Sequence, residues 1–215
     1  MGLSDSSKKS LATLLEELVL TDQAEEYLGS RGLGSQARSM FHLGVVPPGA
    51  SAEWSRFEGM LAIPYETMSG PVAVKFRRLD KSALHKYDGP AGQSARLFNV
   101  KATMSTGSQI VVTEGEIDAI TLTAECGLPA VGVPGVTNWQ PHYSRCVDGF
   151  ADVIILTDND NKREGQNPGL DLALKIRESV RNSRIVSLPP GYDVNDYFVE
   201  FGKQAVLDLV PSVTQ

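Results

Sequence analysis

The chain has 215 residues, of which 41% are hydrophobic and 21% are charged, and its net charge is −6. This composition is ordinary for a globular protein of one or two modest domains, and no apolar run approaches the roughly 18 residues of a membrane span. We therefore expect a cytoplasmic protein with no membrane association. The two cysteines and three histidines have no zinc-ligand spacing, so we expect no zinc in this chain.

The first part of the chain predicts a small α+β region. Leucines recur at helical spacing within residues 10–18, and a second helix is expected to begin after Thr21 and to end at Gly29. Residues 60–65 and 71–79 then predict two strands that are joined by a Gly-containing turn.

A basic segment interrupts this acidic chain. Residues 71–101 contain seven Lys or Arg residues and two Asp residues, hence a local charge of +5. Such a segment is either an ordinary solvated surface or an electrostatic track for a nucleic-acid backbone.

From residue 109 onward, predicted strands and helices alternate, which implies a parallel sheet covered by helices on both faces. The Thr, Ser and Gly stretch at 102–108 suggests a boundary, so we expect domains at 1–104 and 105–215. The expected strands are 109–113, 130–133, 153–156 and 184–188, and the expected helices are 116–126, 169–180 and 194–210. Core positions are expected at Leu170, Leu172, Leu174 and Ile176.

Two aspartates follow the apolar run Val153–Leu156, namely Asp158 and Asp160. Residues i and i+2 of an extended chain point to the same side, so both carboxylates can converge on one point. Two close anions repel each other unless a cation lies between them, and hard oxygen ligands favour Mg²⁺ or Mn²⁺. The alternative is an ordinary turn, in which Asp and Asn make local hydrogen bonds.

Acidic residues also follow two other predicted strands. Strand 109–113 runs into Glu114 and Gly115, and the glycine leaves room for a close approach by backbone or ligand. Open α/β sheets bind ligands at the carboxyl ends of their strands, so acids from several strands should meet there. This pattern favours a metal site over a turn. The remaining acids and amide at this edge are Glu116, Asp118, Asp193, Asn195 and Asp196.

The segments "VTEGEIDAI", "LTDNDNKREG" and "LPPGYDVNDYF" resemble the TOPRIM domain of bacterial and phage primases, topoisomerases and some nucleases. The resemblance covers roughly residues 108–200, and its final motif is most similar to the primase branch. It implies a Rossmann-like α/β domain with a mostly parallel sheet. The upstream segments "LAIPYETMSGPVAVKFRRLD" and "KYDGPAGQSARLFN" are similar to the smaller α+β amino-terminal subdomain of the DnaG-like primase core.

This resemblance implies a DNA primase, which is a nucleotidyltransferase of the DNA-directed RNA polymerase type. Such an enzyme makes short RNA primers from ribonucleoside triphosphates on single-stranded DNA during replication, here from a phage-encoded core. It implies two or more Mg²⁺ or Mn²⁺ ions on the catalytic residues Glu114, Asp158 and Asp160, with Asp118 and Asp193 as further ligands or supports. The implied nucleic-acid and nucleotide contacts are Lys75, Arg77, Arg78, Lys86, Arg96 and Lys101, and the resemblance does not separate Arg77 from Arg78.

Other interpretations stay open at this point. Asp118 suits the first turn of a helix through the helix dipole, Asp196 suits the N-cap of the last helix, and Glu116 suits a solvated position. A TOPRIM nuclease, or a non-catalytic nucleic-acid- or partner-binding replication subunit, would use the same fold. The zinc-ribbon and helicase domains of longer primases have no counterpart in this sequence. We therefore expect a separate zinc-module protein, or its loss, and a replicative helicase as partners.

Overall fold

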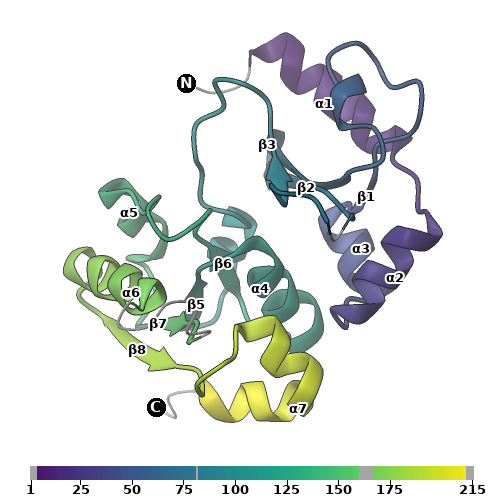
Figure 1. Ribbon diagram of the computed structural model, residues 1–215. Helices are drawn as coiled ribbons and strands as arrows, with labels where there is room; N and C mark the ends of the chain where they lie inside the picture. Colours follow the sequence, from purple (N-terminus) through teal and green to yellow (C-terminus); the bar gives the residue numbers. More distant parts are fainter. Residues whose placement is uncertain (1–3, 81, 160–166, 212–215) are drawn as a thin grey trace. The chain divides into compact units, whose positions relative to one another are not determined.

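A computed structural model describes residues 4–80, 82–159 and 167–211 of the chain. It contains two compact units, Met1–Arg96 and Leu97–Gln215 (Figure 1). Within the described residues, no helix is long and apolar enough to cross a membrane.

The second unit begins ahead of the boundary expected after residue 104. Leu97 is 4% exposed and packs in the hydrophobic core of the second unit. Phe98 forms an antiparallel bridge with Gly132, and its backbone N–H donates to the Gly132 carbonyl over 2.8 Å. Apolar packing therefore sets the start of this unit, and the polar stretch at 102–108 already lies inside it.

The first unit contains a four-stranded antiparallel sheet with the order β1-β2-β3-β4. Two of its strands form the predicted hairpin, and β4 is a short edge strand. The strands are β1 (Gly44–Val45), β2 (Leu61–Thr67), β3 (Gly70–Arg77) and β4 (Tyr87–Asp88).

Helices cover this sheet. Thr21 caps its helix as predicted, since its side chain accepts a hydrogen bond from the Ala24 backbone N–H. On one face of the sheet, Leu11 and Leu14 pack with Phe57 and Phe76 in one core. The helices are α1 (Asp5–Glu17), α2 (Asp22–Ser30) and α3 (Ser35–Phe41), with the 3₁₀ turn η1 (Ser55–Phe57).

The second unit contains a four-stranded parallel sheet with the order β6-β5-β7-β8. Its central strands are short, rich in β-branched residues and buried, as expected for a parallel sheet that is covered on both faces. The predicted α/β class is confirmed. The strands are β5 (Gln109–Thr113), β6 (Ala130–Gly132), β7 (Asp152–Thr157) and β8 (Ser183–Ser187).

Helices lie on opposite faces of this sheet (Figure 1). Leu172 and Ile176 of α6 pack against one face, whereas Ala119 of α4 lies against Gly132 on the other. The longer segments are α4 (Glu116–Ile120), which continues into the π-helical turn η3 (Thr121–Cys126), then α6 (Pro168–Ser179) and α7 (Val194–Leu209). The short ones are η2 (Val100–Met104), η4 (Pro141–Tyr143) and α5 (Ser144–Val147).

Two predicted core positions of α6 are wrong. Leu170 is 37% exposed and Leu174 is 44% exposed, whereas Leu172 and Ile176 are buried as predicted. A helical period of about 3.6 residues places positions four apart on one face, so the intervening leucines turn toward solvent.

Candidate functional site

Glu114 lies at the carboxyl end of the buried strand β5, and Gly115 is the N-cap of α4. A Cβ atom on Gly115 would lie 2.8 Å from Oδ2 of Asp118, closer than two such atoms approach in proteins. The glycine expected from the sequence therefore makes room for a neighbouring carboxylate.

Asp158 follows β7, and its Oδ1 is shielded from solvent. Gly169 lies in the first turn of α6, where a Cβ atom would lie 2.7 Å from the Asp158 carbonyl oxygen and 3.4 Å from Oε2 of Glu114. The missing side chain thus lets α6 close on the ends of β5 and β7, and it places the Glu114 carboxylate near Asp158. Sequence reasoning missed Gly169, because its role comes from contacts with two other elements and not from its neighbours in the sequence.

Asn159 joins the loop after β7 to the loop after β8. Its backbone N–H donates to the Tyr192 carbonyl over 2.9 Å, and its carbonyl accepts from the Gly191 N–H over 2.7 Å. Its side-chain amide donates to the Leu188 carbonyl over 3.0 Å. These bonds fix the backbone beside Asp158 against the loop that leads to Asp193.

Asp193 is the N-cap of α7, and its side chain accepts a hydrogen bond from the Asp196 backbone N–H over 2.6 Å. The prediction that Asp196 caps this helix is therefore wrong. The helix begins at Val194, two residues ahead of Asp196, so Asp196 lies within its first turn.

Asp118 is a buried carboxylate that interacts electrostatically with three other acidic residues. It is 7% exposed, and Oδ1 accepts a hydrogen bond from the Asn195 backbone N–H over 3.1 Å. Burial, together with the negative charges of Asp193, Glu114 and Glu116, raises the pKa of Asp118 to about 8, against the opposing effect of the hydrogen bond. Carboxylates that follow β5 and β8 are therefore close enough to interact.

Glu116 and Asn195 are buried parts of this site. Glu116 is 3% exposed, so the expectation of a solvated first-turn side chain is wrong. Asn195 is 1% exposed, and its side-chain amide donates to Oγ1 of Thr121 over 2.8 Å. The amide thereby links α7 to η3, and it positions the backbone N–H that Asp118 accepts.

The donors at this edge are carboxylate oxygens, which suit a hard divalent cation. In the parts of the chain that the structure describes, no three His, Cys, Asp or Glu residues form a ready-made metal site, and Asp160 lies outside the described residues. Mg²⁺ often binds through one or two carboxylates and completes its shell with substrate phosphates and water. A cation would also relieve the repulsion that raises the pKa of Asp118. The pair Glu114 and Asp158 therefore fits such an ion.

Strand alternation divides the basic residues of the first unit between two faces of its sheet. Lys75 and Arg77 share one face with Tyr87, which lies directly opposite Arg77 on β4. The Arg77 guanidinium lies 4.6 Å from the ring centroid of Tyr27 and 5.0 Å from that of Tyr87, and it donates to the Tyr87 hydroxyl over 2.6 Å. The Lys75 ammonium lies 4.4 Å from the Tyr87 centroid. Aromatic rings therefore hold these two cations.

Arg78 and Lys86 lie on the other face. The Arg78 backbone N–H donates to the Lys86 carbonyl over 2.9 Å, which makes the two residues cross-strand neighbours beyond the end of β3. The Arg78 side chain is 43% exposed, so it is more open to an external anion than the half-buried Arg77. This difference separates two residues that the sequence left equivalent.

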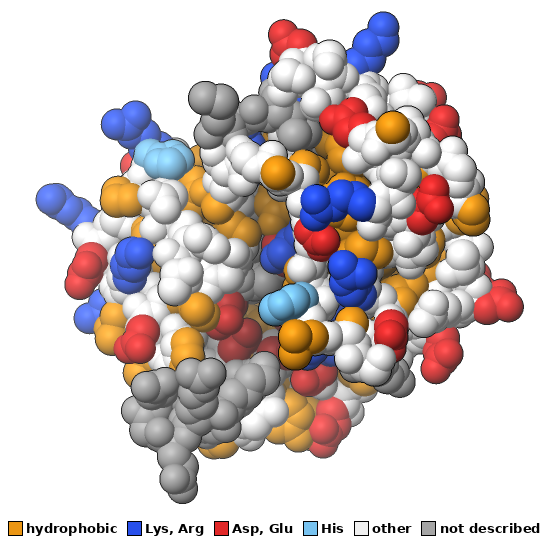
Figure 2. Space-filling view, turned by 45° about the horizontal axis from the view of Figure 1, so that its top comes forward, with side chains coloured by type: hydrophobic (Ala, Val, Ile, Leu, Met, Phe, Trp, Pro, Cys, Tyr) orange, Lys and Arg blue, Asp and Glu red, His pale blue; other side chains and the backbone are white. Residues whose placement is uncertain are grey.

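The remaining basic candidates are Arg96 and Lys101. Nε of Arg96 is buried and has no hydrogen-bond partner among the described residues, and Lys101 belongs to η2 of the second unit. On the face drawn in Figure 2, Lys and Arg side chains alternate with Asp and Glu and do not form a continuous basic surface.

Residues 109–204 match the family model of the Toprim domain. The Gene 57 protein of Mycobacterium phage D29 is 38% identical to this chain over 159 residues, which are 72% of this chain and 99% of that protein. The chain belongs to the family of this phage protein. Its Toprim domain lies within the second unit and contains the strand-end acids described above.

The fold of this Toprim protein is similar to that of several solved structures. The RNA polymerase domain of the Mycobacterium tuberculosis primase DnaG is 22% identical, with a TM-score of 0.76 over 96% of this chain and 83% of that chain. A DnaG primase catalytic domain bound to single-stranded DNA is 19% identical, with a TM-score of 0.76 over 94% of this chain and 77% of that chain. Both units therefore have the fold of a DnaG-like primase core, and the predicted resemblance is confirmed.

Proposed function

We propose that this Toprim protein is a DNA primase core that synthesises short RNA primers on single-stranded DNA in a divalent-metal-dependent reaction. The supporting observation is that Glu114, Glu116 and Asp193 interact with Asp118, in a fold that matches primase catalytic cores over nearly the whole chain. A nuclease with the same Toprim acids is the rival that an experiment must separate.

The proposed chemistry uses the acids of the second unit. Glu114 and Asp158, together with Asp160, would hold Mg²⁺ or Mn²⁺ at the carboxyl edge of the sheet. When bound, such ions supply charge neutralisation for the triphosphate and activation of the attacking 3′-hydroxyl. Gly169 and the hydrogen bonds of Asn159 preorganise the backbone around these carboxylates, which reduces the motion required when nucleotide binds.

Asp118 and Asp193 suit supporting positions in this proposal. Asp193 is engaged by the first turn of α7, and Asp118 accepts the Asn195 backbone N–H, so each carboxylate has one oxygen committed within the protein. Asp118 lies within electrostatic reach of Asp193 and of Glu114, and a cation bound at Glu114 would favour the ionised form of Asp118.

The proposed substrates are a single-stranded DNA template and ribonucleoside triphosphates. The exposed pair Arg78 and Lys86 suits phosphate, since both side chains are open and cationic. Lys75 and Arg77 suit a positioning role, because their cations are stacked on Tyr87 next to Lys86. We also propose that a zinc-module protein and a replicative helicase act with this chain as separate partners in the cytoplasm.

The test is primer synthesis on single-stranded DNA with labelled ribonucleotides and Mg²⁺ or Mn²⁺, with products resolved by size. We expect short RNA from the wild type, and a loss of at least about 100-fold in Asp158→Asn, because a metal-binding carboxylate is removed. The control Asp208→Asn neutralises an exposed acid of α7 and should keep wild-type activity. Metal-dependent cleavage of the DNA, without RNA synthesis, would instead support the nuclease.

A further inference from the structure

One carboxylate of the first unit lies between two arginines. Oδ1 of Asp88 is 2.7 Å from Nη2 of Arg56, and Oδ2 is 3.5 Å from Nη2 of Arg78. Oδ1 also accepts a hydrogen bond from the Gly89 backbone N–H over 2.7 Å. The three charged residues come from η1, from the end of β3 and from β4, so the fold brings them together from distant positions in the sequence.

Both arginines keep donors for a further anion. The Arg56 side chain is 55% exposed and that of Arg78 is 43% exposed, whereas that of Asp88 is 29% exposed. Each planar guanidinium carries more N–H groups than one shared carboxylate can accept. Ion pairs this exposed contribute little to stability, so exchanging Asp88 for another anion costs little.

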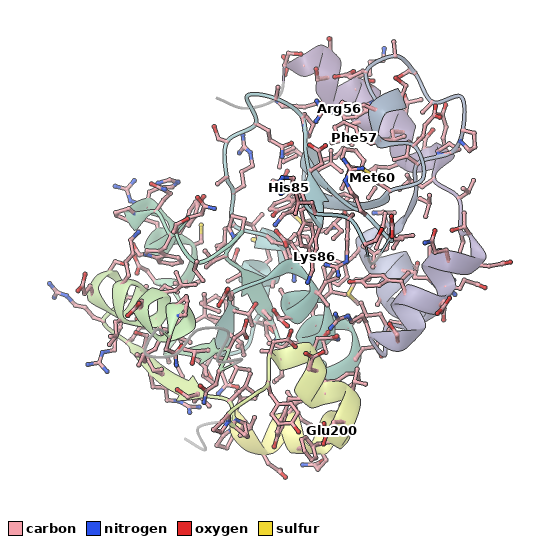
Figure 3. The ribbon with its side chains drawn as sticks, in the orientation of Figure 1. Arg56, Phe57, Met60, His85, Lys86 and Glu200 are labelled. Atoms are coloured by element: carbon pink, nitrogen blue, oxygen red, sulfur yellow. The ribbon has the colours of Figure 1, made fainter. Side chains whose placement is uncertain are left out.

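Arg56 is held by more than its charge. Its guanidinium lies 4.6 Å from the ring centroid of Phe57, which is 1% exposed and belongs to the core of the first unit. Both residues belong to η1, and Figure 3 labels them next to each other. Stacking on a fixed ring keeps the fork of Arg56 in place when its carboxylate partner is exchanged.

The two arginines continue the basic pair described above. Arg78 is the cross-strand neighbour of Lys86, and Arg56 reaches the same carboxylate as Arg78. Arg56 lies outside the basic segment 71–101 that the sequence defines, and only the fold shows that it lies beside Arg78. Two cations, Arg56 and Arg78, therefore lie around the one acid Asp88, and Lys86 is the backbone neighbour of Arg78.

We propose that Arg56 and Arg78 bind backbone phosphate of single-stranded DNA, and that Asp88 is an internal anion that competes with this phosphate. The inference rests on the proposed function, and it adds a template contact and a residue that limits template affinity. Asp88 occupies the guanidinium groups in the free protein, and a phosphate of the DNA replaces it with the charge-assisted, two-pronged contacts that arginine makes. A strand that also reaches Lys86 gains a third contact. The triphosphate of a free nucleotide also offers phosphate oxygens to these arginines, so the test compares binding of DNA with binding of ATP.

The test measures binding of a fluorescent oligo-deoxythymidine as a function of salt. Asp88→Asn keeps an oxygen for the Gly89 N–H and frees both arginines, so we expect affinity to rise about threefold or more, on the scale of one phosphate contact. Arg56→Gln should weaken binding and lower the steepness of the log–log salt dependence by about 0.7, the contribution of one phosphate of a single strand. In the double variant Asp88→Asn, Arg56→Gln, most of the affinity gained by Asp88→Asn alone should be lost.

The chain offers a matched control pair, Arg38 and Glu25, which form a 3.4 Å ion pair between α3 and α2. Glu25→Gln removes the same negative charge as Asp88→Asn, and Arg38→Gln removes the same positive charge as Arg56→Gln. Thermal unfolding checks that each variant is folded. Should Arg56→Gln fail to fold, Arg56→Lys retains the charge without the fork and should weaken binding while it preserves the salt dependence.

Equal effects of Asp88→Asn and Glu25→Gln, or of Arg56→Gln and Arg38→Gln, would overturn the inference and leave the proposed function standing. A change in ATP binding without a change in oligonucleotide binding would also overturn it, because the site would then take nucleotide. Salt-independent or absent oligonucleotide binding by the wild type would remove DNA binding from the proposed function as well.

Discussion

Burial and the neighbouring carboxylates both disfavour the charged form of Asp118. Burial and, after it, the charge of Asp193 raise its pKa in the folded protein to about 8, from an ordinary value of 3.8. Between these two values the folded state binds a proton that the unfolded state has released. The free energy of unfolding of the metal-free protein therefore falls as pH rises from about 4 to about 8, by at most about 1.4 kcal/mol per pH unit.

Asp118→Asn should remove this pH dependence. The amide oxygen of asparagine still accepts the Asn195 backbone N–H, and the variant has no charge to bury. In urea unfolding without divalent metal, we expect the variant to match the wild type near pH 4 and to exceed its stability near pH 8. Asp208→Asn, on the exposed part of α7, should follow the wild type at both values. Equal stabilities of Asp118→Asn and the wild type near pH 8 would contradict the expectation.

At the residue scale, local motifs predicted part of the site. Glu114 and Asp158 could be predicted because each directly follows an apolar β-branched run, a pattern that depends on neighbours in the sequence. The burial of Glu116 and the capping role of Asp193 depend on where α7 begins and on what packs against it. Gly169 acts through its distance to atoms of two other elements, so the local sequence does not reveal its role.

At the scale of elements, a glutamine side chain extends the sheet of the first unit. Oε1 of Gln93 accepts the Val74 backbone N–H over 3.0 Å, and its Nε2 donates to the Val74 carbonyl over 3.0 Å. Val74 is fully buried in β3, and the edge strand β4 pairs only with the end of β3. Gln93 therefore supplies the two hydrogen bonds that a longer edge strand would have supplied.

Gln93→Ala should leave both backbone groups of Val74 without these bonds, at a cost of about 1–3 kcal/mol in the free energy of unfolding. Faster hydrogen exchange of the Val74 amide would report the local opening. Gln204→Ala is the control, because its amide bonds Asp208 on an exposed helix face and should change stability by less than about 0.5 kcal/mol. Unchanged exchange at Val74 would show that the Gln93 bonds are dispensable.

Elements were predicted where one periodicity dominates. The strand at 109–113 and the cap at Thr21 followed from the sequence because both signals are local. The helix expected over 116–126 instead changes to a π-helical turn at Thr121. Oγ1 of Thr121 donates to the Ile117 carbonyl over 2.8 Å and accepts from the Asn195 side chain, so a contact with α7 accompanies the change. The sequence around Thr121 does not predict this contact, because its partner Asn195 is far away in the sequence.

At the scale of the whole molecule, two kinds of side chain are divided between the two units. The strand-end acids Glu114, Asp118 and Asp158 belong to Leu97–Gln215, and the exposed pair Arg78 and Lys86 belongs to Met1–Arg96. Alternating strands and helices predicted the α/β unit, because that pattern persists over about half of the chain. Because these three acids and this basic pair belong to different units, we expect that the proposed catalysis and the proposed template binding can be removed one at a time.

Asp158→Asn should abolish primer synthesis while its affinity for oligo-deoxythymidine stays within about twofold of the wild type, because the substitution leaves the basic pair intact. The double variant Arg78→Gln, Lys86→Gln should show the reverse. The slope of log binding constant against log salt concentration should become less steep by about 1.4, because each of the two cations contributes about 0.7. Higher DNA concentration should restore primer synthesis by this double variant, because its acids remain. Binding titrations and product gels on the same preparations measure both properties. Weak DNA binding by Asp158→Asn, or no recovery of synthesis by the double variant, would mean that the acids and the bases act as one inseparable site.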